Sequence, residues 1–194
     1  MPPNSCALTL GCMVIYRRNR APGATYFFTL TLSDRSTRLL VDHIHRLRHA
    51  YALMRERHPF RTDAIVILPD HLHCIWTLPE GDDRYSMRWR LIKTSFTSGL
   101  RADGVIVGRR SNGERRIWQR RFREHTIRDA DDLQRHVDYI HFNPVKHGHV
   151  ERVADWPYSS LHRHVAKGLL PANWAGSLDA ARVPGIASLH PLRK

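Results

Sequence analysis

The segment that most constrains the fold is residues 65–78 (IVILPDHLHCIWTL), which has the pattern of two apolar strands joined by a tight turn at Pro69 and Asp70. Because only this turn separates the strands, we expect them to pair antiparallel. Side chains alternate between the two faces of a strand, so His71 and His73 share one face. Their Cα atoms are then about 6.5–7 Å apart, and the two imidazoles can bind one divalent ion. For an isolated His-x-His pattern, a turn-capping histidine beside a half-buried strand histidine is the more frequent explanation.

The charge of the chain indicates the kind of partner. Its 194 residues contain 31 Lys and Arg against 18 Asp and Glu, a formal net charge of +13, and the sequence pI is about 10.6. Such a chain is typical of proteins that bind a polyanion. A basic protein of the membrane surface is the competing explanation, but no long basic amphipathic helix stands out. No apolar run approaches the ~18 residues of a membrane span, so we expect no membrane partner.

Length and composition predict one domain with short extensions. The apolar segment 7–15 has no Lys or Arg before it, which argues against a secretory signal, and we expect residues 1–15 to be a loose N-terminal extension. Residues 16–175 are expected to form the domain, and residues 176–194 a mobile tail. The three Cys form neither a C-x-x-C pair nor a disulfide framework, which suits a reducing cytosol.

The remaining sequence predicts strands alternating with helices. Aromatic and β-branched residues at 26–32 predict a strand, and a short strand is expected at 105–107. Apolar residues at helical spacing predict helices at about 37–58, capped by Ser33 or Asp34, at 86–100, capped by Ser86, and at 129–142. Pro144 is expected to close the last helix, because the residue before a proline disfavours the helical region. The strand–helix–strand–strand–helix–strand order predicts an α+β fold, an antiparallel sheet with helices on one face.

Residues 109–123 carry the densest charge, with seven Arg against one Glu and with Trp118 and Phe122 among them. A charged run is most often a solvated face. Arginines interleaved with aromatic rings, in a chain this basic, favour instead a surface for phosphates and unpaired bases.

Tyr139 and Asn143 lie four residues apart near the end of the last predicted helix, and therefore on one face of it. Tyr139 falls outside the predicted core stripe of that helix, so burial does not account for it well. A phenol becomes a nucleophile when nearby charge lowers its pKa from ~10, and the Asn143 amide oxygen is a candidate third metal ligand beside His71 and His73. The ordinary alternatives are a rim tyrosine bonded to backbone and a helix-capping asparagine.

Taken together, these motifs resemble a known family. His71-Leu72-His73 is similar to the His-hydrophobe-His signature of HUH single-strand endonucleases, and residues 139–148 (YIHFNPVKHG) are similar to the single-tyrosine helix of their transposase branch. The closer resemblance is to REP-associated tyrosine transposases, relatives of single-strand insertion-sequence transposases that are linked to repetitive extragenic palindromes. Further matching segments, in the same order from residue 16 to about 175, begin at Tyr16, Pro22, Leu68, Trp118 and Asp155.

The resemblance implies a ferredoxin-like sheet of the HUH endonuclease type, with the two histidines central and the tyrosine helix packed across it. It implies Mg²⁺ or Mn²⁺ as cofactor and no small-molecule cofactor, although imidazole ligands would also suit Zn²⁺. It implies cleavage of single-stranded or hairpin DNA through a 5′-phosphotyrosine intermediate in a cytoplasmic, nucleoid-associated enzyme, monomeric or homodimeric. Where the family often has a second tyrosine this chain has Phe142, which leaves Tyr139 as the candidate nucleophile. Many insertion-sequence relatives have Gln at the position of Asn143.

We expect DNA contacts from basic and aromatic side chains in four segments of the chain: Arg17, Arg18, Arg20, Lys93, Trp118, Arg120, Arg121, Lys146 and His147. Two other functions remain to be distinguished from a transposase. A hairpin-binding regulatory or architectural protein would keep the basic surfaces without turnover, and the intact His71, His73 and Tyr139 argue against it. A zinc hydrolase would use the histidines with water, but there is no H-E-x-x-H motif or suitably spaced carboxylate.

Overall fold

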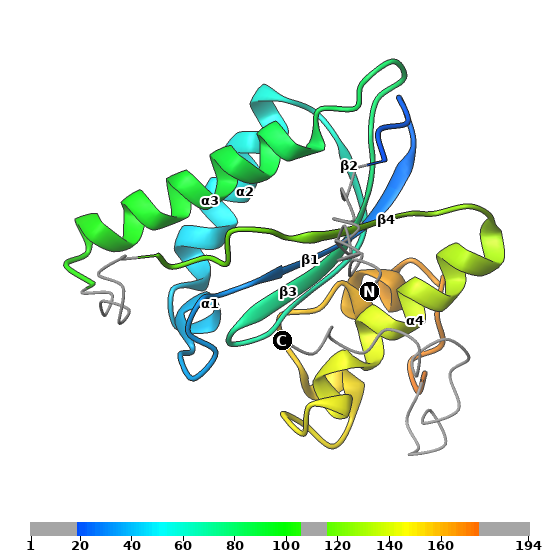
Figure 1. The fold of residues 1–194 in the computed structure, drawn as a ribbon. Coiled ribbons are helices and arrows are strands. Elements are labelled where there is room, and N and C mark those ends of the chain that lie inside the picture. Colours follow the sequence, from blue (N-terminus) through cyan, green and yellow to red (C-terminus); the bar gives the residue numbers. More distant parts are fainter. Residues whose placement is uncertain (1–18, 106–115, 175–194) are drawn as a thin grey trace, which may run out of the picture.

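The computed structural model describes residues 19–105 and 116–174, so the predicted N-terminal extension, the predicted tail, Arg17 and Arg18 lie outside it. The two described stretches contain ten elements (Figure 1): β1 (Thr25–Thr31), α1 (Leu39–Asp42), α2 (Ile44–Arg57), β2 (Arg61–Ile67), β3 (His71–Thr77), α3 (Tyr85–Ala102), β4 (Arg123–Thr126), α4 (Ala130–Lys146), the 3₁₀ helix η1 (Val153–Asp155) and α5 (Leu161–Ala166). No helix in the described residues is long and apolar enough to cross a membrane.

The sheet confirms the predicted α+β fold. Its strand order is β2-β3-β1-β4 and each neighbouring pair is antiparallel, which is the order of a ferredoxin-like sheet built from two split βαβ units. The predicted hairpin forms from β2 and β3, with the turn at Pro69 and Asp70 between them. The central pair β1 and β3 sets His73 opposite Thr29 and His71 opposite Thr31.

The two faces of the sheet are covered by different helices. Figure 1 shows α2 and α3 together on one side and α4 on the other. On the first side, Trp76 stacks on Trp89 of α3 with ring centroids 4.0 Å apart, and Tyr51 of α2 packs against both rings. On the second side, Phe27 of β1 contacts Tyr139 of α4. The prediction of helices on one face therefore holds for α2 and α3, which connect strands of the sheet. It does not hold for α4, which covers the opposite face (Figure 1), where the two histidines lie.

Two local predictions were wrong, and a third lies mostly outside the described residues. The fourth strand of the sheet is Arg123–Thr126; of the strand expected at 105–107 only Val105 is among the described residues, and it is not in a strand. α4 continues through Pro144 to Lys146, because a proline in the last turn removes only one of the final hydrogen bonds. α1 and α3 have no side-chain cap, so neither Ser33, Asp34 nor Ser86 begins a helix as expected.

The edge strand β2 is covered by the residues after η1. The amide of Ile67 donates to the carbonyl of Tyr158 (2.9 Å), and the amide of Ser160 donates to the carbonyl of Ile65 (2.8 Å). The indole of Trp156 donates to the carbonyl of Ile67 (2.9 Å). An uncovered edge strand offers unpaired backbone N–H and C=O groups to other chains. Residues 156–160 form hydrogen bonds with such groups of Ile65 and Ile67 in β2.

Candidate active site

The two histidines of β3 lie side by side on the face that α4 covers, with ring centroids 5.0 Å apart. Both are buried. Nδ1 of His73 is 2.8 Å from the hydroxyl of Thr29 on β1, so one ring nitrogen is fixed by the neighbouring strand. The other nitrogen, Nε2, is buried and has no hydrogen-bond partner among the described residues. An orphaned imidazole nitrogen held in this way is suited to ligate a metal.

His71 is oriented from the turn that precedes it. Its Nδ1 is 2.6 Å from Oδ1 of Asp70, and Nε of Arg35 donates to Oδ2 of the same carboxylate at 2.7 Å. Burial acts to raise the pKa of Asp70, but the hydrogen bonds from His71 and Arg35 outweigh it and hold the pKa well below its usual range. The ionised carboxylate therefore fixes the His71 ring with its Nε2 directed away from the turn, an arrangement that metal-binding histidines commonly use.

α4 brings Tyr139 onto the histidines. Its ring meets His73 edge-on with centroids 5.1 Å apart, and Nζ of Lys146 lies 4.9 Å from the ring centroid. The side chain is only 6% exposed, contrary to the expectation that burial would not explain this tyrosine. α4 is buried on more than one side, because the chain after it packs against Phe142 while the sheet packs against Tyr139.

Asn143 lies on the same face of α4 and is fully buried, with no hydrogen-bond partner for Oδ1 or Nδ2 in the described part of the chain. A buried amide without partners costs free energy, and a bound ligand would account for its retention here. The helix continues past Asn143, so it is not the helix cap considered above.

Burial sets the protonation of the site. It raises the pKa of the Tyr139 phenol, while the Asn143 amide and the Arg123 guanidinium act in the opposite direction. It lowers the pKa of His73 well below the usual value, and the nearby His71, His147 and Lys146 add to that effect. At neutral pH His73 is therefore neutral, which leaves its nitrogen lone pair available to a metal.

The residues present fit a divalent cation. Nε2 of His73 and Oδ1 of Asn143 are buried lone-pair donors without partners, and His71 adds a second oriented imidazole. Two imidazoles and an amide oxygen are ligands that Mn²⁺ or Zn²⁺ accepts, and Mg²⁺ accepts with added water.

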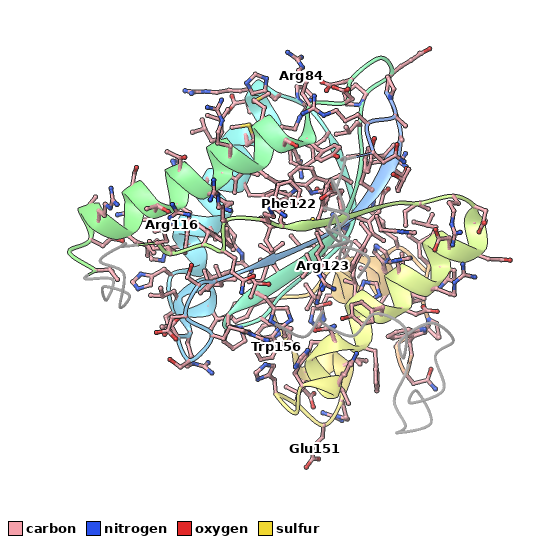
Figure 2. The ribbon with its side chains drawn as sticks, viewed as in Figure 1. Arg84, Arg116, Phe122, Arg123, Glu151 and Trp156 are labelled. Atoms are coloured by element: carbon pink, nitrogen blue, oxygen red, sulfur yellow. The ribbon has the colours of Figure 1, made fainter. Side chains whose placement is uncertain are left out.

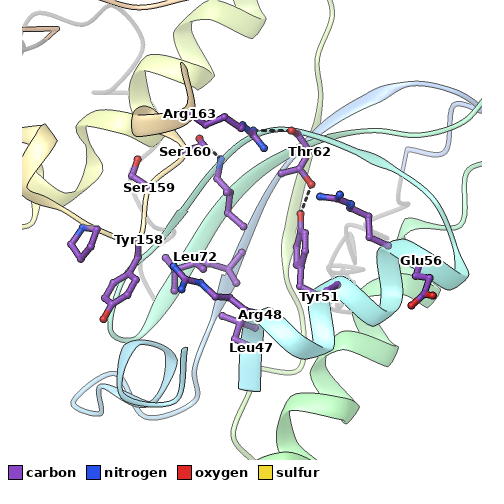
Figure 3. Close-up of a pocket in the computed structure, with 15 residues that line it drawn as sticks. Leu47, Arg48, Tyr51, Glu56, Thr62, Leu72, Tyr158, Ser159, Ser160 and Arg163 are labelled. Carbon is purple, nitrogen blue, oxygen red and sulfur yellow. Dashed lines mark hydrogen bonds between the residues drawn. The ribbon is translucent and has the colours of Figure 1, made fainter. Parts of the chain in front are cut away.

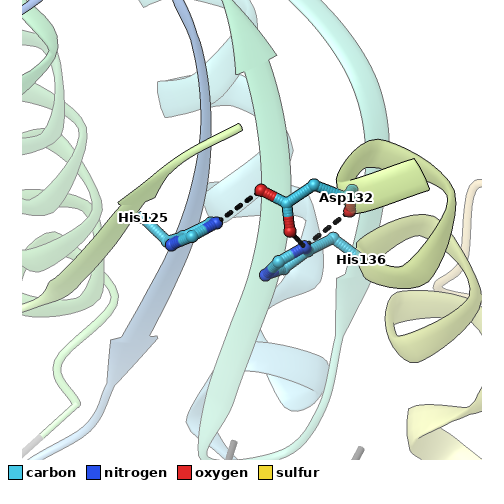
Figure 4. A group of neighbouring side chains, drawn as sticks. All are labelled: His125, Asp132 and His136. Atoms are coloured by element: carbon cyan, nitrogen blue, oxygen red, sulfur yellow. Dashed lines mark hydrogen bonds and ion pairs between the residues drawn. The ribbon is translucent and has the colours of Figure 1, made fainter. Parts of the chain in front are cut away.

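A second group of possible ligands was not found from the sequence: His125 of β4 with Asp132 and His136 of α4 (Figure 4). One ligand atom from each lies within 4.8 Å of the others, so this group could hold a metal ion. Asp132 and His136 are four apart on a helix, a spacing visible in the sequence; that His125 faces them follows only from the pairing of β4 with β1.

Several features of this second group are those of a hydrogen-bond network that links β4 to α4 and stabilises the fold. The Asp132 carboxylate accepts from His125 Nε2 (2.8 Å) and from the backbone amide of Arg128 (3.1 Å), and Arg135 also reaches it. Burial acts to raise the pKa of Asp132, but these hydrogen bonds and nearby charges hold it well below its usual range. The rings of His125 and His136 are stacked, 4.7 Å apart and 16° from parallel. In-plane lone pairs of stacked rings do not converge on one point unless a ring turns.

The expected DNA contacts fall into several places. Lys93, Trp118 and Arg120 line a groove of about 810 Å³ between α3 and the segment 116–122. Figure 2 shows Arg116 and Phe122 along this segment, beside α3. The cationic side chains that line the groove come from both of its walls: Arg90, Lys93, Arg101, Arg116 and Arg120.

The other expected contacts lie outside this groove. Arg20 and Arg121 are exposed, and Lys146 and His147 lie at the end of α4 beside Tyr139 and His71. Trp118 is only 6% exposed and packs edge-on against Phe96. Its burial, with a bridge between Trp118 and Leu32, leaves little ring surface on which a base could stack.

Comparisons with known proteins agree with this architecture. The chain is 49% identical over 163 residues to a REP-associated tyrosine transposase of Escherichia coli strain K12, covering 84% of the chain and 92% of that relative. It is 49% identical over 166 residues to a Haemophilus influenzae protein assigned to the same transposase group, covering 84% of the chain and 94% of the relative. A solved structure of a REP-associated tyrosine transposase bound to a REP hairpin superimposes with a TM-score of 0.75 at 49% identity, covering 85% of this chain and 93% of that one. No family model matches the chain.

Proposed function

The chain belongs to the REP-associated tyrosine transposases, DNA-processing enzymes, and on that premise we propose that it cuts and rejoins one DNA strand beside a hairpin. Tyr139 is the nucleophile, and His71, His73 and Asn143 hold the divalent cation. The substrate is a folded single strand that carries a repetitive extragenic palindrome, and the intermediate is a 5′-phosphotyrosine.

One observation carries the proposal. Tyr139 packs against His73, and the buried atoms around them that lack partners, Nε2 of His73 and both amide atoms of Asn143, belong to the same site. A fold that kept these residues only for packing would be expected to pair or replace such atoms. A nucleophile beside unpaired ligand atoms supports metal-assisted attack on a phosphate.

In the proposed step, Oη of Tyr139 attacks the scissile phosphorus and a new O–P bond forms. The bond from phosphorus to the 3′-oxygen of the preceding nucleotide breaks, and that oxygen leaves as a 3′-hydroxyl after taking up a proton. The phenol gives up its own proton to solvent, which its raised pKa opposes, and solvent returns a proton to the departing 3′-oxygen. The ammonium of Lys146, beside the ring, stabilises the phenolate. When bound, Mg²⁺ or Mn²⁺ would supply positive charge to the attacked phosphate.

The covalent bond explains why a tyrosine suits this chemistry better than a water molecule. The phosphodiester energy is kept in the protein–DNA bond, so a 3′-hydroxyl can attack it and restore a DNA strand. A hydrolase would release that energy with the product.

The groove between α3 and segment 116–122 is suited to the stem of the hairpin. The described residues that line it contribute five cationic side chains, the hydroxyls of Ser86, Thr94, Thr97 and Ser98, and no carboxylate. Guanidinium, ammonium and hydroxyl groups are the usual contacts of phosphate oxygens. Such contacts fix the position of a duplex without reading its sequence.

The test is a cleavage and rejoining assay with a labelled single strand that folds into a palindromic hairpin with unpaired flanks. With Mg²⁺ or Mn²⁺ we expect a covalent protein–DNA adduct and, on addition of a second 3′-hydroxyl strand, a rejoined product. The perfect duplex of the same sequence should be neither cut nor bound as tightly. Full cleavage in EDTA would contradict the metal assignment, and tight hairpin binding without any adduct would favour a non-catalytic hairpin-binding protein.

A further inference from the structure

A second groove, distinct from the one beside α3, opens at the edge of the sheet (Figure 3). It has a volume of about 600 Å³ and lies between α2, the edge strand β2 and the segment 157–163. Ile65, Ile67 and Leu72 form its floor, on the face of the sheet opposite His71 and His73. We call it the Arg48–Tyr158 groove, after the two side chains that flank its mouth.

The lining of this groove combines an apolar floor with cationic and aromatic walls. Arg48 and Arg55 come from α2 and Arg163 from α5. Among the described residues that line the groove, Glu56, at the outer rim in Figure 3, is the one acidic side chain. The guanidinium of Arg48 lies 5.9 Å from the ring centroid of Tyr158. Apolar floor, aromatic ring and guanidinium groups together match a nucleotide, whose base is flat and apolar on its faces and whose phosphates are anionic.

The aromatic wall is held rigidly. The backbone of Tyr158 and Ser160 is hydrogen-bonded to β2, and the side-chain hydroxyl of Ser160 accepts from the amide of Ile65 at 2.8 Å. Arg163 donates to the carbonyls of Thr62 and Asp63 (3.0 and 3.1 Å). A ring presented from so fixed a backbone loses little conformational freedom when a base stacks on it.

A path of rings leads from the candidate active site to this groove. His147 lies 5.1 Å from His71, His149 lies 6.2 Å from His147, and Trp156 lies 5.3 Å from His149. Tyr158 is 5.6 Å from Trp156. His147 and His149 are exposed, and the ring of His149 stacks on the buried Trp156. The two histidines therefore form an exposed surface along the side of the molecule, and Trp156 holds the ring of His149 in place.

We propose that the unpaired DNA flank leaves the active site along His147 and His149, and that the Arg48–Tyr158 groove holds one unpaired nucleotide of that flank. Its base stacks on Tyr158 above the apolar floor, and the phosphates on either side of it bind Arg48 and Arg55. This inference rests on the proposed function, since it assigns a place to the single-stranded part of the same substrate. Sequence preference in the flank then comes from the shape and polar rim of the groove.

The test compares two labelled strands, the hairpin alone and the hairpin with an unpaired flank, by fluorescence anisotropy at one ionic strength. Tyr158→Leu and Arg48→Ala should each lower affinity for the flanked hairpin about tenfold, the size expected of one lost base stack or phosphate contact. Neither should change affinity for the bare hairpin. Arg57→Ala, which removes the same charge from α2 outside the groove, is the matched control and should leave both affinities unchanged.

A second measurement locates the nucleotide directly. Flanks carrying 5-iodouracil at successive positions are irradiated in the wild-type complex, and the cross-linked peptides are identified by mass spectrometry. We expect one flank position to link to the peptide containing Tyr158, and an abasic nucleotide at that position to abolish the effect of Tyr158→Leu.

Several results would overturn the inference. If wild-type protein binds the hairpin but the variants bind both strands as wild type does, or if cross-links appear only in other peptides, the groove does not hold the flank and the proposed function still stands. An equal loss on both strands would mean that the groove supports the fold. If wild-type protein binds neither strand, the inference fails together with the proposed function.

Discussion

His73 is one of the residues at which the sheet contacts α4, and its surroundings bear on which side chains can hold a metal. Thr29 fixes one ring nitrogen and leaves the other buried without a partner. At His136, in the group with His125 and Asp132, Nδ1 is 2.8 Å from the carbonyl of Asp132, and Nε2 also has no partner among the described residues. The surroundings of a single histidine therefore do not show which group is better suited to a metal. The neighbouring charges do, because the Asp132 carboxylate already lies against the cations Arg128 and Arg135.

Direct metal titration distinguishes the two groups. We expect His73→Ala to abolish binding of one Mn²⁺ per chain, measured by electron paramagnetic resonance, and Thr29→Val to weaken it about tenfold through loss of the ring's orienting hydrogen bond. His125→Ala should leave the affinity unchanged. The converse pattern, with binding lost in His125→Ala and kept in His73→Ala, would assign the ion to the group around Asp132.

At the scale of elements, Arg88 joins α3 to the chain on either side of the hairpin. It is 1% exposed, binds both oxygens of Asp82 (3.0 and 2.8 Å) and donates to the carbonyls of His58 and Pro59. Nε and both Nη atoms of Arg88 therefore take part in hydrogen bonds. Through them, the Arg88–Asp82 ion pair fixes the start of α3 against the residues that follow α2.

Removal of Arg88 should therefore destabilise the fold strongly. We expect Arg88→Leu to lower the free energy of unfolding by ~3 kcal/mol, as when a buried ion pair loses one partner. Arg84→Leu is the control, since Arg84 is exposed and 3.6 Å from the same carboxylate; its effect should stay below ~1 kcal/mol. Urea denaturation at pH 7 measures both. Equal losses of unfolding free energy in the two variants would show that the buried Arg88–Asp82 ion pair contributes no more to stability than the exposed Arg84.

The same pair predicts a pH dependence. The Arg88 hydrogen bond, against the opposing effect of burial, lowers the pKa of Asp82 well below its usual range. The stabilisation is then complete above the unfolded-state value of ~3.9 and is lost as pH falls from there toward the folded-state pKa. Between pH 5 and pH 3, wild type should lose more stability than Arg88→Leu. Parallel loss in the two proteins would contradict the assignment.

The elements also show what the sequence predicts and what it does not. The shared face of His71 and His73 follows from strand alternation, and that of Tyr139 and Asn143 from the helical repeat, so both halves of the site were predictable. β4 was not, because its sequence (REHT) is polar and lacks alternation, and it forms by pairing with β1. The contact of His125 with Asp132 depends on that pairing. Trp118 was predicted to stack on bases, but its bridge to Leu32 buries it.

At the scale of the whole molecule, the net charge of +13 makes binding sensitive to salt. The logarithm of the affinity falls linearly with the logarithm of the salt concentration, and each phosphate neutralised by a cation steepens the slope of that fall by about 0.7–0.9. We expect Arg120→Ala, in the groove beside α3, to reduce that slope by about one and to weaken binding to all hairpin sequences alike. Arg57→Ala, outside both grooves, should leave the slope unchanged. A sequence-dependent loss in Arg120→Ala would indicate a base contact in place of a phosphate contact.

The central claim, that Tyr139 forms the covalent bond to DNA, can be tested by locating the adduct on the chain. Wild-type protein is incubated with the flanked hairpin strand and Mn²⁺, digested with nuclease and protease, and analysed by mass spectrometry, with Tyr139→Phe treated in parallel. The account predicts a nucleotide linked through its 5′-phosphate to Tyr139 in wild type, and no adduct in Tyr139→Phe although that variant binds the hairpin with nearly unchanged affinity. An adduct on another residue such as Tyr158, or an undiminished adduct in Tyr139→Phe, would contradict it.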